Sequence, residues 1–506
     1  MSTSAETFDV VVIGGGPGGS ACATLIAQQG HRVLLLERDK LPIYKIGESL
    51  LPATVHGICA ILGVTEELKA ANFVRKLGGT FRWGRNKEPW TFSFASSPRF
   101  PGPSSFAYQV ERIKFDAILL SNARRKGVDV RERHRAMEPL IDETGRVAGV
   151  RAANDQGDRL DIRARYVVDA SGHGSTLARH VSERIYSEFF RNVAIFGYFL
   201  NGGRLPAPNS GNIYSVAFER GWIWYIPLSD TLTSVGVVIG QEHASTTLKQ
   251  DREEALRGLI AECPQVRNLL QGARRATDAP YDEIRIRKDF SYCHTAFWRP
   301  GLVLVGDAAC FIDPVFSSGV HLATYSALLA ARSVNTFLAN RLTETEVFAE
   351  FQKRYLREYG FFHDFLVAFY DLDQELDQYY WAARKALGAD VSGREAFIRL
   401  VGGGAGTDHV LVAPGGGGVA TASALSEQLF PVAQVQGVDD MHLASEARRD
   451  ISPLTTAREQ FMTALTTESV QMQAQARQIR YSQTPLFTDG LVPSADGLQW
   501  EPRHRR

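Results

Sequence analysis

Residues 8–19, FDVVVIGGGPGG, decide the fold of this chain. Their first half, Phe8–Ile13, is a short apolar and β-branched run, which predicts a buried strand of a parallel sheet. Residues 20–29 beyond the glycines predict a helix, and a second apolar run over residues 32–36 ends in the acidic residue Glu37. Strand, glycine turn, helix, strand and acid in this order predict a unit that binds a dinucleotide.

Each glycine of the G-x-G-x-x-G turn has its own physical task. Gly14 makes the tight turn, Gly16 lets the backbone approach a pyrophosphate, and Gly19 lets the helix pack closely on the strand. The helix N-terminus presents free N–H groups and a positive dipole end to the phosphates. Glu37 follows Gly14 by 23 residues, where its carboxylate can accept hydrogen bonds from the ribose hydroxyls.

Later segments favour FAD as the dinucleotide, because they resemble FAD-dependent monooxygenase-like proteins. The run Leu302–Val305 leads into Asp307, and in these proteins such an aspartate holds the ribityl chain of the flavin. Tyr166–Ala170, ahead of Ser171-Gly172, resembles their middle Asp-Gly element with one residue inserted. Arg112 resembles the arginine that they place near the cofactor. Each segment alone could be a strand-end turn or a surface charge, but their joint order favours FAD.

A second glycine-rich segment imitates a nucleotide-binding turn. Residues 400–406, LVGGGAG, lack the third glycine and are not followed by a helix-like pattern, and more glycines come at 415–418. We interpret residues 402–418 as a flexible connection. The chain then has no separate NADPH domain, and a separate flavin reductase is expected to supply the reduced flavin.

Composition excludes several classes of protein. The chain has 506 residues, of which 44% are hydrophobic and 22% charged, as in globular proteins. Its 56 basic and 56 acidic residues balance, which argues against nucleic acid or an anionic membrane surface as the main partner. No apolar run reaches the roughly 18 residues that a spanning helix needs, and the N-terminus lacks signal-peptide features. Five scattered cysteines without a CxxC motif predict reduced thiols, no metal site and a cytoplasmic protein.

Four further segments resemble the flavin-dependent halogenases. They are Gly47–Pro52 (GESLLP), Lys76 within FVRKLGG, the W-x-W-x-I-P signature at residues 222–227, and DPVFSSGVH at residues 313–321. The resemblance runs from about residue 7 to about residue 400, and more loosely to the end of the chain. It is greatest to the enzymes that chlorinate phenolic rings, tyrosyl or β-tyrosyl groups in particular, on peptidyl carrier proteins in glycopeptide, enediyne and chondrochloren biosynthesis. The chain does not resemble the tryptophan halogenases, whose substrate-binding insertions are not found.

The resemblance implies a chemistry with FADH2, chloride and O2 as reactants. In this family, chloride attacks a flavin C4a-hydroperoxide and yields hypochlorous acid, and a lysine between flavin and substrate forms a chloramine or hydrogen-bonds the oxidant. Lys76 matches that lysine. A nucleophilic lysine needs a desolvated site that lowers its pKa, although most lysines are solvated surface residues. Arg75 is an alternative cation that cannot readily lose a proton.

A halide site is expected at Ser318 and Gly319. These residues precede a predicted helix over residues 320–331, whose backbone N–H groups could bind a chloride beside the flavin. Gly319 allows close backbone approach. The alternative is a helix cap after Pro314.

Other residues are assigned supporting positions. Trp222, Trp224 and Pro227 are expected to form a wall that separates the substrate from the flavin, with a tryptophan-rich core strand as the alternative. Glu48 and Ser49 are expected to line the flavin or the lysine channel, with a helix cap as the alternative. No general base for the phenol is identifiable, and the candidates by residue type alone are His56, His173, His294 and His321.

The predicted fold class is α/β, with a Rossmann-type FAD domain interwoven with an antiparallel-sheet substrate domain and followed by a helical C-terminal region. We assign these parts as follows: residues 7–70, 108–180 and 285–335 to the FAD-binding domain, 71–107 and 185–284 to the substrate-sheet domain, and 336–506 to the C-terminal region with its glycine-rich linker 402–418.

The C-terminal region carries two further patterns. Aromatic residues recur at helical spacings between residues 345 and 400, which favours core packing over a docking surface or substrate wall. Residues 419–480 predict a polar, lid-like helical segment. Its arginines are interpreted as solvated charge, with a basic dock for an acidic carrier protein as the alternative: Arg448, Arg449 and Arg458.

The sequence thus predicts a FADH2-dependent halogenase acting on a phenolic ring. The alternatives are a flavin-dependent aromatic hydroxylase of the same fold and a non-enzymatic, carrier-binding or electron-carrying flavoprotein.

Overall fold

A computed structural model describes most of the chain. The described residues are 6–100, 102–247, 249, 251–388, 390–406, 408–411 and 490–502. Within these ranges the strands form one sheet of eight strands, one of nine, and two small sheets of two strands each. The expected lid at residues 419–480 lies outside the described residues, and so do the three arginines assigned to it.

The first large sheet carries the glycine turn. Its central strands β1, β2, β10 and β18 are parallel, and β1 lies between β10 and β2. Ile13 is in register with Asp169, and Asp169 with Leu304, so these strands end at one edge of the sheet. The strands are β1 Thr7–Ile13, β2 Val33–Leu36, β7 Asp129–Arg131, β8 His134–Ile141, β9 Val147–Asn154, β10 Arg159–Asp169, β17 Trp298–Arg299 and β18 Leu302–Leu304.

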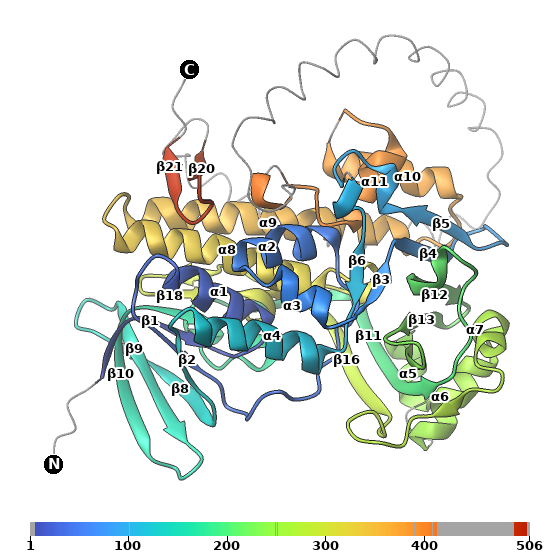
Figure 1. The fold of residues 1–506 in the computed structure, drawn as a ribbon, viewed down its shortest axis with the longest axis horizontal. Coiled ribbons are helices and arrows are strands. Elements are labelled where there is room, and N and C mark those ends of the chain that lie inside the picture. The colour runs from blue at the N-terminus through green and yellow to red at the C-terminus, as the bar shows by residue number, and fades with distance from the viewer. Residues whose placement is uncertain are drawn as a thin grey trace.

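Two buried helices pack beside this sheet and against each other. Helix α1 (Pro17–Ala27) begins directly after the glycine turn, and its residues up to Ile26 are all buried. Helix α8 (Gly319–Leu338) contacts α1 and also α9 (Glu344–Phe369), which runs beside it across the molecule (Figure 1). The N-terminus of α8 therefore lies close to the edge at which the parallel strands end. Helix α4 (Arg112–Arg125) packs on α1 from another side.

The second large sheet is mostly antiparallel and is built around the long strand β11. Strand β11 pairs with β14 on one side and β16 on the other. Strand β16 corrects our domain assignment, because residues 285–294 belong to this sheet rather than to the FAD-binding domain. The strands are β4 Gly78–Arg82, β5 Trp90–Ser93, β11 Arg184–Leu200, β12 Ile213–Phe218, β13 Gly221–Pro227, β14 Leu232–Gly240, β15 Arg274–Arg275, β16 Arg285–His294 and β19 Cys310–Phe311.

Shorter elements join the two sheets. Strand β3 (Val74–Lys76) pairs antiparallel with β6 (Ala107–Gln109) in a small sheet of its own. The remaining helices of the described residues before α8 are α2 Cys59–Leu62, α3 Thr65–Ala70, α5 Gln241–Thr247, α6 Arg252–Ala261 and α7 Pro264–Leu269. None of the helices in the described ranges is long and apolar enough to cross a membrane.

The aromatic residues of the C-terminal helices form core, as their spacing predicts. Phe362, Phe365 and Phe369 of α9 are fully buried, and Tyr379 of α10 (Leu376–Leu387) is too. Trp381 differs, since 55% of it is exposed. Helix α11 (Gly393–Val401) packs against α10 (Figure 1).

Residues 402–411 do not form the flexible connection that their composition predicts. Gly402 accepts a hydrogen bond from the backbone N–H of Ala53, and a Cβ on Gly402 would lie 2.3 Å from the ring of Phe100. The fully buried Asp408 forms an ion pair with the equally buried Arg332 of α8. Tertiary packing thus orders the described part of this stretch, residues 402–406 and 408–411, while residues 407 and 412–418 of the expected linker lie outside the described residues.

The last described residues return to the same helix. Strands β20 (Leu491–Pro493) and β21 (Trp500–Pro502) form a hairpin beside α8 and α9 (Figure 1). The indole Nε1 of Trp500 donates to Ser333 Oγ at 2.9 Å, and Arg332 also donates to the carbonyl of Gly497. One arginine of α8 therefore contacts both segments that follow α11.

The buried ion pair leads to a stability prediction. Asp408→Asn leaves the Arg332 charge buried without its counter-charge, so we expect the free energy of unfolding to fall by about 3–5 kcal/mol. The matched control is Asp390→Asn, whose partner Arg384 is 40% exposed while the aspartate is fully exposed. That control should change stability by less than about 1 kcal/mol in urea unfolding. Equal effects of the two changes would contradict a fixed 402–411 segment.

Candidate active site

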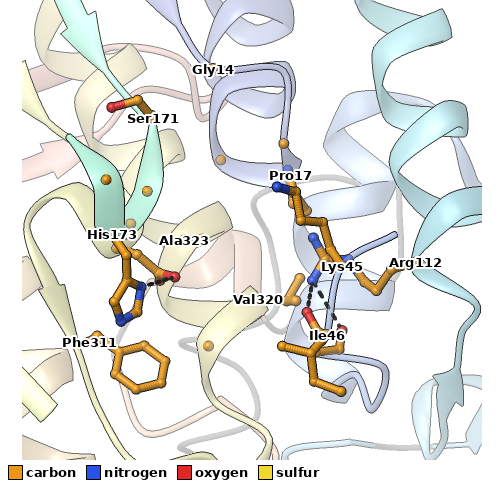
Figure 2. A pocket seen from close by; sticks show the side chains of 18 of the residues that line it. Gly14, Pro17, Lys45, Ile46, Arg112, Ser171, His173, Phe311, Val320 and Ala323 are labelled. Carbon is orange, nitrogen blue, oxygen red and sulfur yellow. Dashed lines mark hydrogen bonds and ion pairs between the residues drawn. The ribbon is translucent and has the colours of Figure 1, made fainter. Parts of the chain in front are cut away.

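One cavity of about 790 Å³ extends from the glycine turn to strand β13. Figure 2 shows the part of it between Gly14, Arg112 and His173. Its lining includes residues of both large sheets and the start of α8. A cavity of this size suits a bound cofactor or small ligand. It brings together most of the predicted site residues: Gly14, Gly16, Glu37, Glu48, Ser49, Arg112, Trp222, Trp224, Asp307 and Gly319.

Four predicted residues do not line this cavity. They are Gly19, Lys76, Pro227 and Ser318. Gly19 packs against the turn instead, because a Cβ on it would lie 1.8 Å from the carbonyl oxygen of Gly14. Lys76 and Ser318 lie directly behind cavity residues, as described below.

The glycine turn has the shape that a pyrophosphate requires. Gly14 has φ +101°, and a Cβ there would lie 2.5 Å from the carbonyl oxygen of Ala170. Gly16 is different, since a Cβ on it would meet no atom within 4 Å. Gly16 is also the N-cap of α1, and no side chain caps that helix. The free N–H groups of the first turn are therefore available to a phosphate.

Glu37 braces the turn from the end of β2. Its Oε2 accepts the N–H of Gly15 at 2.6 Å, and its Oε1 accepts the N–H of Asp39 at 2.9 Å. These bonds fix the carboxylate at the cavity edge. Each oxygen keeps a lone pair that could accept a ribose hydroxyl.

Asp307 and His173 meet across the cavity, each just beyond the end of a parallel strand. Asp307 is on the short helix η7 (Gly306–Ala308), and its Oδ2 lies 3.2 Å from Nδ1 of His173 on η4 (Gly172–Gly174) (Figure 2). Of the four histidine candidates, only His173 is among the cavity residues. The others have structural contacts: His56 with the Phe106 carbonyl, His294 with Ser182, and His321 with Glu358.

The guanidinium of Arg112 is occupied by an ion pair and a backbone carbonyl, so it does not offer a free charge to the cavity. Its Nε and Nη2 donate to Asp116 at 2.8 and 2.9 Å, and Nη1 donates to the carbonyl of Ile46 at 2.6 Å (Figure 2). The adjacent Lys45 also lines the cavity, and sequence reasoning missed it. The feature of the sequence that could have pointed to Lys45 is its position three residues before Glu48, which was already assigned to the site. Burial lowers the pKa of Lys45.

Lys76 is buried behind Ser49. Only 3% of Lys76 is exposed, and its Nζ donates to Ser49 Oγ at 2.9 Å and to the Leu50 carbonyl at 3.1 Å. Among the described residues no charged group contributes to the shift of its pKa, which has burial as its cause. Burial lowers the pKa of Lys76 to about 7, so near neutral pH a large fraction of this amine is uncharged.

Glu48 is the neighbouring buried acid. It is 2% exposed, and its Oε1 accepts the hydroxyl of Tyr198 at 2.6 Å. Its Oε2 has no hydrogen-bond partner among the described residues. Burial raises the pKa of Glu48 to about 7.

The start of α8 has features that suit an anion. Ser317 has φ +60° and Gly319 begins the helix, and both line the cavity. A Cβ on Gly319 would meet nothing within 4 Å, so the first helical turn is open to an ion. Ser318 is fully buried, and its Oγ has no hydrogen-bond partner among the described residues. An unpartnered hydroxyl beside free helical N–H groups suits a desolvated anion such as chloride.

Three side chains of strand β13 line the cavity, and the third of them is not the expected one. Trp222, Trp224 and Ile226 line the cavity, whereas Ile223 and Tyr225 pack in a separate core cluster on the opposite face. Pro227, which we expected in the wall, does not line this cavity, because side chains alternate along a strand and residue 226 shares the face of 222 and 224.

The tryptophans are fixed by their indole nitrogens. Trp222 Nε1 donates to the Tyr370 hydroxyl at 2.8 Å, and Trp224 Nε1 donates to Ser234 Oγ at 3.1 Å. No group of three or more His, Cys, Asp or Glu side chains in the described part of the chain could hold a metal ion.

Comparison with known proteins places this site in a family. The family described as Tryptophan halogenase matches residues 9–101 and 98–401. The chain belongs to the flavin-dependent halogenases. Its fold is similar to that of a solved myxobacterial chondrochloren halogenase, CndH, described as a new variant of FAD-dependent halogenases. That structure is 48% identical with a TM-score of 0.75, over 98% of this chain and 100% of the other.

Two curated relatives carry related names. A tryptophan 2-halogenase of Chondromyces crocatus is 35% identical over 379 residues, which is 74% of this chain and 70% of the relative. The flavin-dependent halogenase rdc2 of Metacordyceps chlamydosporia is 32% identical over 364 residues, covering 67% of each chain. The first name does not support our expectation that the chain is unlike the tryptophan halogenases.

The family confirms the general expectations from sequence. This halogenase is an oxidoreductase that uses FAD, chloride and O2, and its α/β fold is that of the FAD-dependent halogenases. Members of the family normally need a flavin reductase.

The open space at Gly16 gives a binding prediction. Gly16→Ala should leave the stability of the flavin-free protein within about 0.5 kcal/mol, because its methyl group meets no protein atom. The same methyl group would separate backbone from phosphate, so we expect FAD affinity to fall about tenfold in a fluorescence titration.

The matched control is Gly258→Ala on α6, where a Cβ also meets nothing within 4 Å. It should leave FAD affinity unchanged. Unaltered affinity in Gly16→Ala would contradict the proposed place of the pyrophosphate.

Proposed function

We propose that this halogenase chlorinates a phenolic ring, tyrosyl or β-tyrosyl, on a peptidyl carrier protein. The observation that carries the chlorination chemistry is Lys76, an amine with a lowered pKa that is joined to the cavity through Ser49. The phenolic substrate is supported by the likeness to the chondrochloren halogenase and by the sequence resemblance. The carrier protein and the cytoplasmic location stay predictions.

The cavity residues would hold FAD from the glycine turn inward. Gly14 and Gly16 would receive the pyrophosphate, Glu37 the adenosine ribose, and Asp307 the ribityl chain. Arg112 would act through the Ile46 and Gly47 carbonyls that its guanidinium holds. Reduced FAD and O2 supply the two-electron oxidation that turns chloride into hypochlorous acid.

The halide would be held where α8 begins. Free N–H groups at Gly319 and the unpartnered hydroxyl of Ser318 can replace the water around a chloride. The apolar face of Trp222 and Trp224 would keep the organic ring out of this part of the cavity.

Lys76 would then control the oxidant. Its neutral amine can attack the chlorine of hypochlorous acid, so that an N–Cl bond forms, the O–Cl bond breaks and water leaves with the amine proton. In its protonated form the same group can hydrogen-bond the oxidant instead. In either mode of action, Ser49 Oγ orients Nζ of Lys76.

Tryptophan is a second candidate substrate. It is favoured by the name of the relative from Chondromyces crocatus and by the description of the matching family. Incubation with a flavin reductase, FAD and chloride separates the candidates when carrier-loaded tyrosyl, free tyrosine and tryptophan are offered in parallel.

Mass spectrometry should show chlorine on the carrier-loaded tyrosyl group. Chlorination of a free amino acid alone would contradict the carrier, and a hydroxylated product would indicate the aromatic hydroxylase.

Lys76→Met is the sharpest test of the site. It keeps the volume and burial but removes the amine, so we expect chlorination to fall by a factor of about 10²–10⁴ while reduced flavin is still oxidised. Lys69→Met is the control, since Lys69 lies on the surface in an ion pair with Glu66. Chlorination by Lys76→Met at the parental rate would contradict the role of this amine.

The lowered pKa of Lys76 predicts a pH dependence of stability, which Lys76→Met also tests. The pKa of Lys76 is about 7 in the folded chain against 10.5 for an ordinary lysine, so between these pH values the unfolded chain binds more protons. The parental protein should gain stability from this group as pH rises from 7 towards 10.5. Lys76→Met should lack that gain and be relatively most stable at pH 6. Parallel curves of unfolding free energy against pH would contradict the lowered pKa.

A further inference from the structure

A line of hydrogen bonds leads away from the cavity through the second sheet. Glu48 lines the cavity, and its Oε1 accepts the hydroxyl of Tyr198 at 2.6 Å. The Tyr198 hydroxyl, fully buried in β11, lies 2.5 Å from the hydroxyl of Tyr44. Tyr44, at the outer end of this line, is the only one of the three side chains that is not fully buried. A buried acid in the cavity wall is thus joined through two phenols to a partly exposed side chain.

We propose that Glu48, Tyr198 and Tyr44 form a proton path between solvent and the flavin cavity. Glu48 is the group that gives protons to the cavity and takes them from it. The proposal rests on the proposed function for the reaction that uses the proton, but the path itself is a property of these three side chains.

Chlorination consumes a proton, so it needs a route by which the proton reaches the cavity. One aryl C–H group, one chloride, one O2, one FADH2 and one proton give an aryl chloride, FAD and two waters. O2 takes two electrons from FADH2 and two from chloride. Each turnover therefore consumes one proton, and that proton must reach the reacting atoms inside the cavity.

The transfer balances along the three side chains. Glu48 releases the proton of its carboxyl group from Oε2 into the cavity, and Oε1 takes the proton of the Tyr198 hydroxyl. Tyr198 takes the proton of Tyr44, and Tyr44 takes one from solvent. Each O–H bond that breaks is replaced, so one proton moves inward. The carboxyl group, now protonated on Oε1, and the two hydroxyls then rotate back to their starting orientation before the next transfer.

The charges around Glu48 suit this use. Burial raises its pKa, while the Tyr198 hydrogen bond, the nearby Ser234 hydroxyl of β14 and Arg112 of α4 lower it, and Glu111 raises it. The result, a pKa of about 7, lets the carboxyl group release and regain a proton near neutral pH.

The two phenols are set to relay protons without ionising. Burial and the Glu48 carboxylate raise the pKa of both Tyr44 and Tyr198 far above the neutral range. Arg285 lies over the ring of Tyr44 and Tyr281 packs on Tyr198, so both rings are held in place. The hydroxyl of Tyr281 donates to Glu111, not to the path.

A purely structural role explains this arrangement poorly. A buried carboxyl group is unfavourable for folding even beside the Tyr198 and Ser234 hydroxyls, and an apolar side chain would fill the same space without that cost. Its retention beside two phenols that lead to the surface is consistent with a function in proton transfer.

The first test cuts the path at its outer end. Tyr44→Phe touches neither the cavity nor the Tyr198–Glu48 bond. We expect oxidation of the bound reduced flavin by O2, followed in a single turnover, to slow about tenfold at pH 8 and less at pH 6, with a larger solvent deuterium isotope effect. Tyr225→Phe is the matched control, since Tyr225 is a buried tyrosine of the same sheet whose hydroxyl donates to the Gly203 carbonyl.

The second test uses the flavin-free protein and needs no turnover. Infrared titration, with Glu48→Gln to assign the carboxyl band, should give Glu48 a pKa near 7. Tyr198→Phe should raise that pKa, because it removes a hydrogen bond that stabilises the ionised carboxylate. Tyr44→Phe should leave the pKa of Glu48 nearly unchanged.

The outcomes separate the path from the proposed function. An ordinary carboxyl pKa in the flavin-free protein, or parental rates and isotope effects in Tyr44→Phe, would overturn the path. If the Tyr44→Phe kinetics and the Glu48 titration are as expected but the protein chlorinates no phenol, the proposed substrate is overturned and the path is not.

Discussion

Exclusion of water from the junction of the two sheets controls the chemistry of this enzyme. Lys76 and Glu48 lie there almost fully buried, and burial moves their pKa values towards neutrality from opposite sides. In water the amine would be charged and the acid ionised, and neither could exchange a proton readily near pH 7. Without the packing of both sheets around the cavity, the same residues would be ordinary surface charges.

The short segment around Glu48 connects the parts of the site. Its backbone is tied to the region after β6, since Glu48 O accepts the N–H of Val110 and Leu50 donates to the Tyr108 carbonyl. Arg112 holds the residues before it, and Lys76 holds those after it. A shift of this segment would move the acid, the lysine and one wall of the cavity together.

Local patterns in the sequence predicted the glycine turn and the strands that flank it, and most of the site residues so predicted line the cavity, because each pattern depends on neighbours within a few positions. The third residue beside the tryptophans in the cavity is Ile226 and not Pro227, which follows from the alternation of side chains along a strand once residues 221–227 are placed on one strand. Residues 402–411 were misread because glycine suits both flexible and closely packed backbone. The partner of Glu48 could not be predicted, because Tyr198 lies 150 residues away on another strand.

The contacts of Arg332 join two stretches of chain that lie far apart in the sequence. Its guanidinium donates to Asp408 and to the carbonyl of Gly497. Both stretches are therefore anchored at one residue of α8. Because a single guanidinium serves both contacts, a substitution at Arg332 would release the two stretches together, even though each also has contacts of its own.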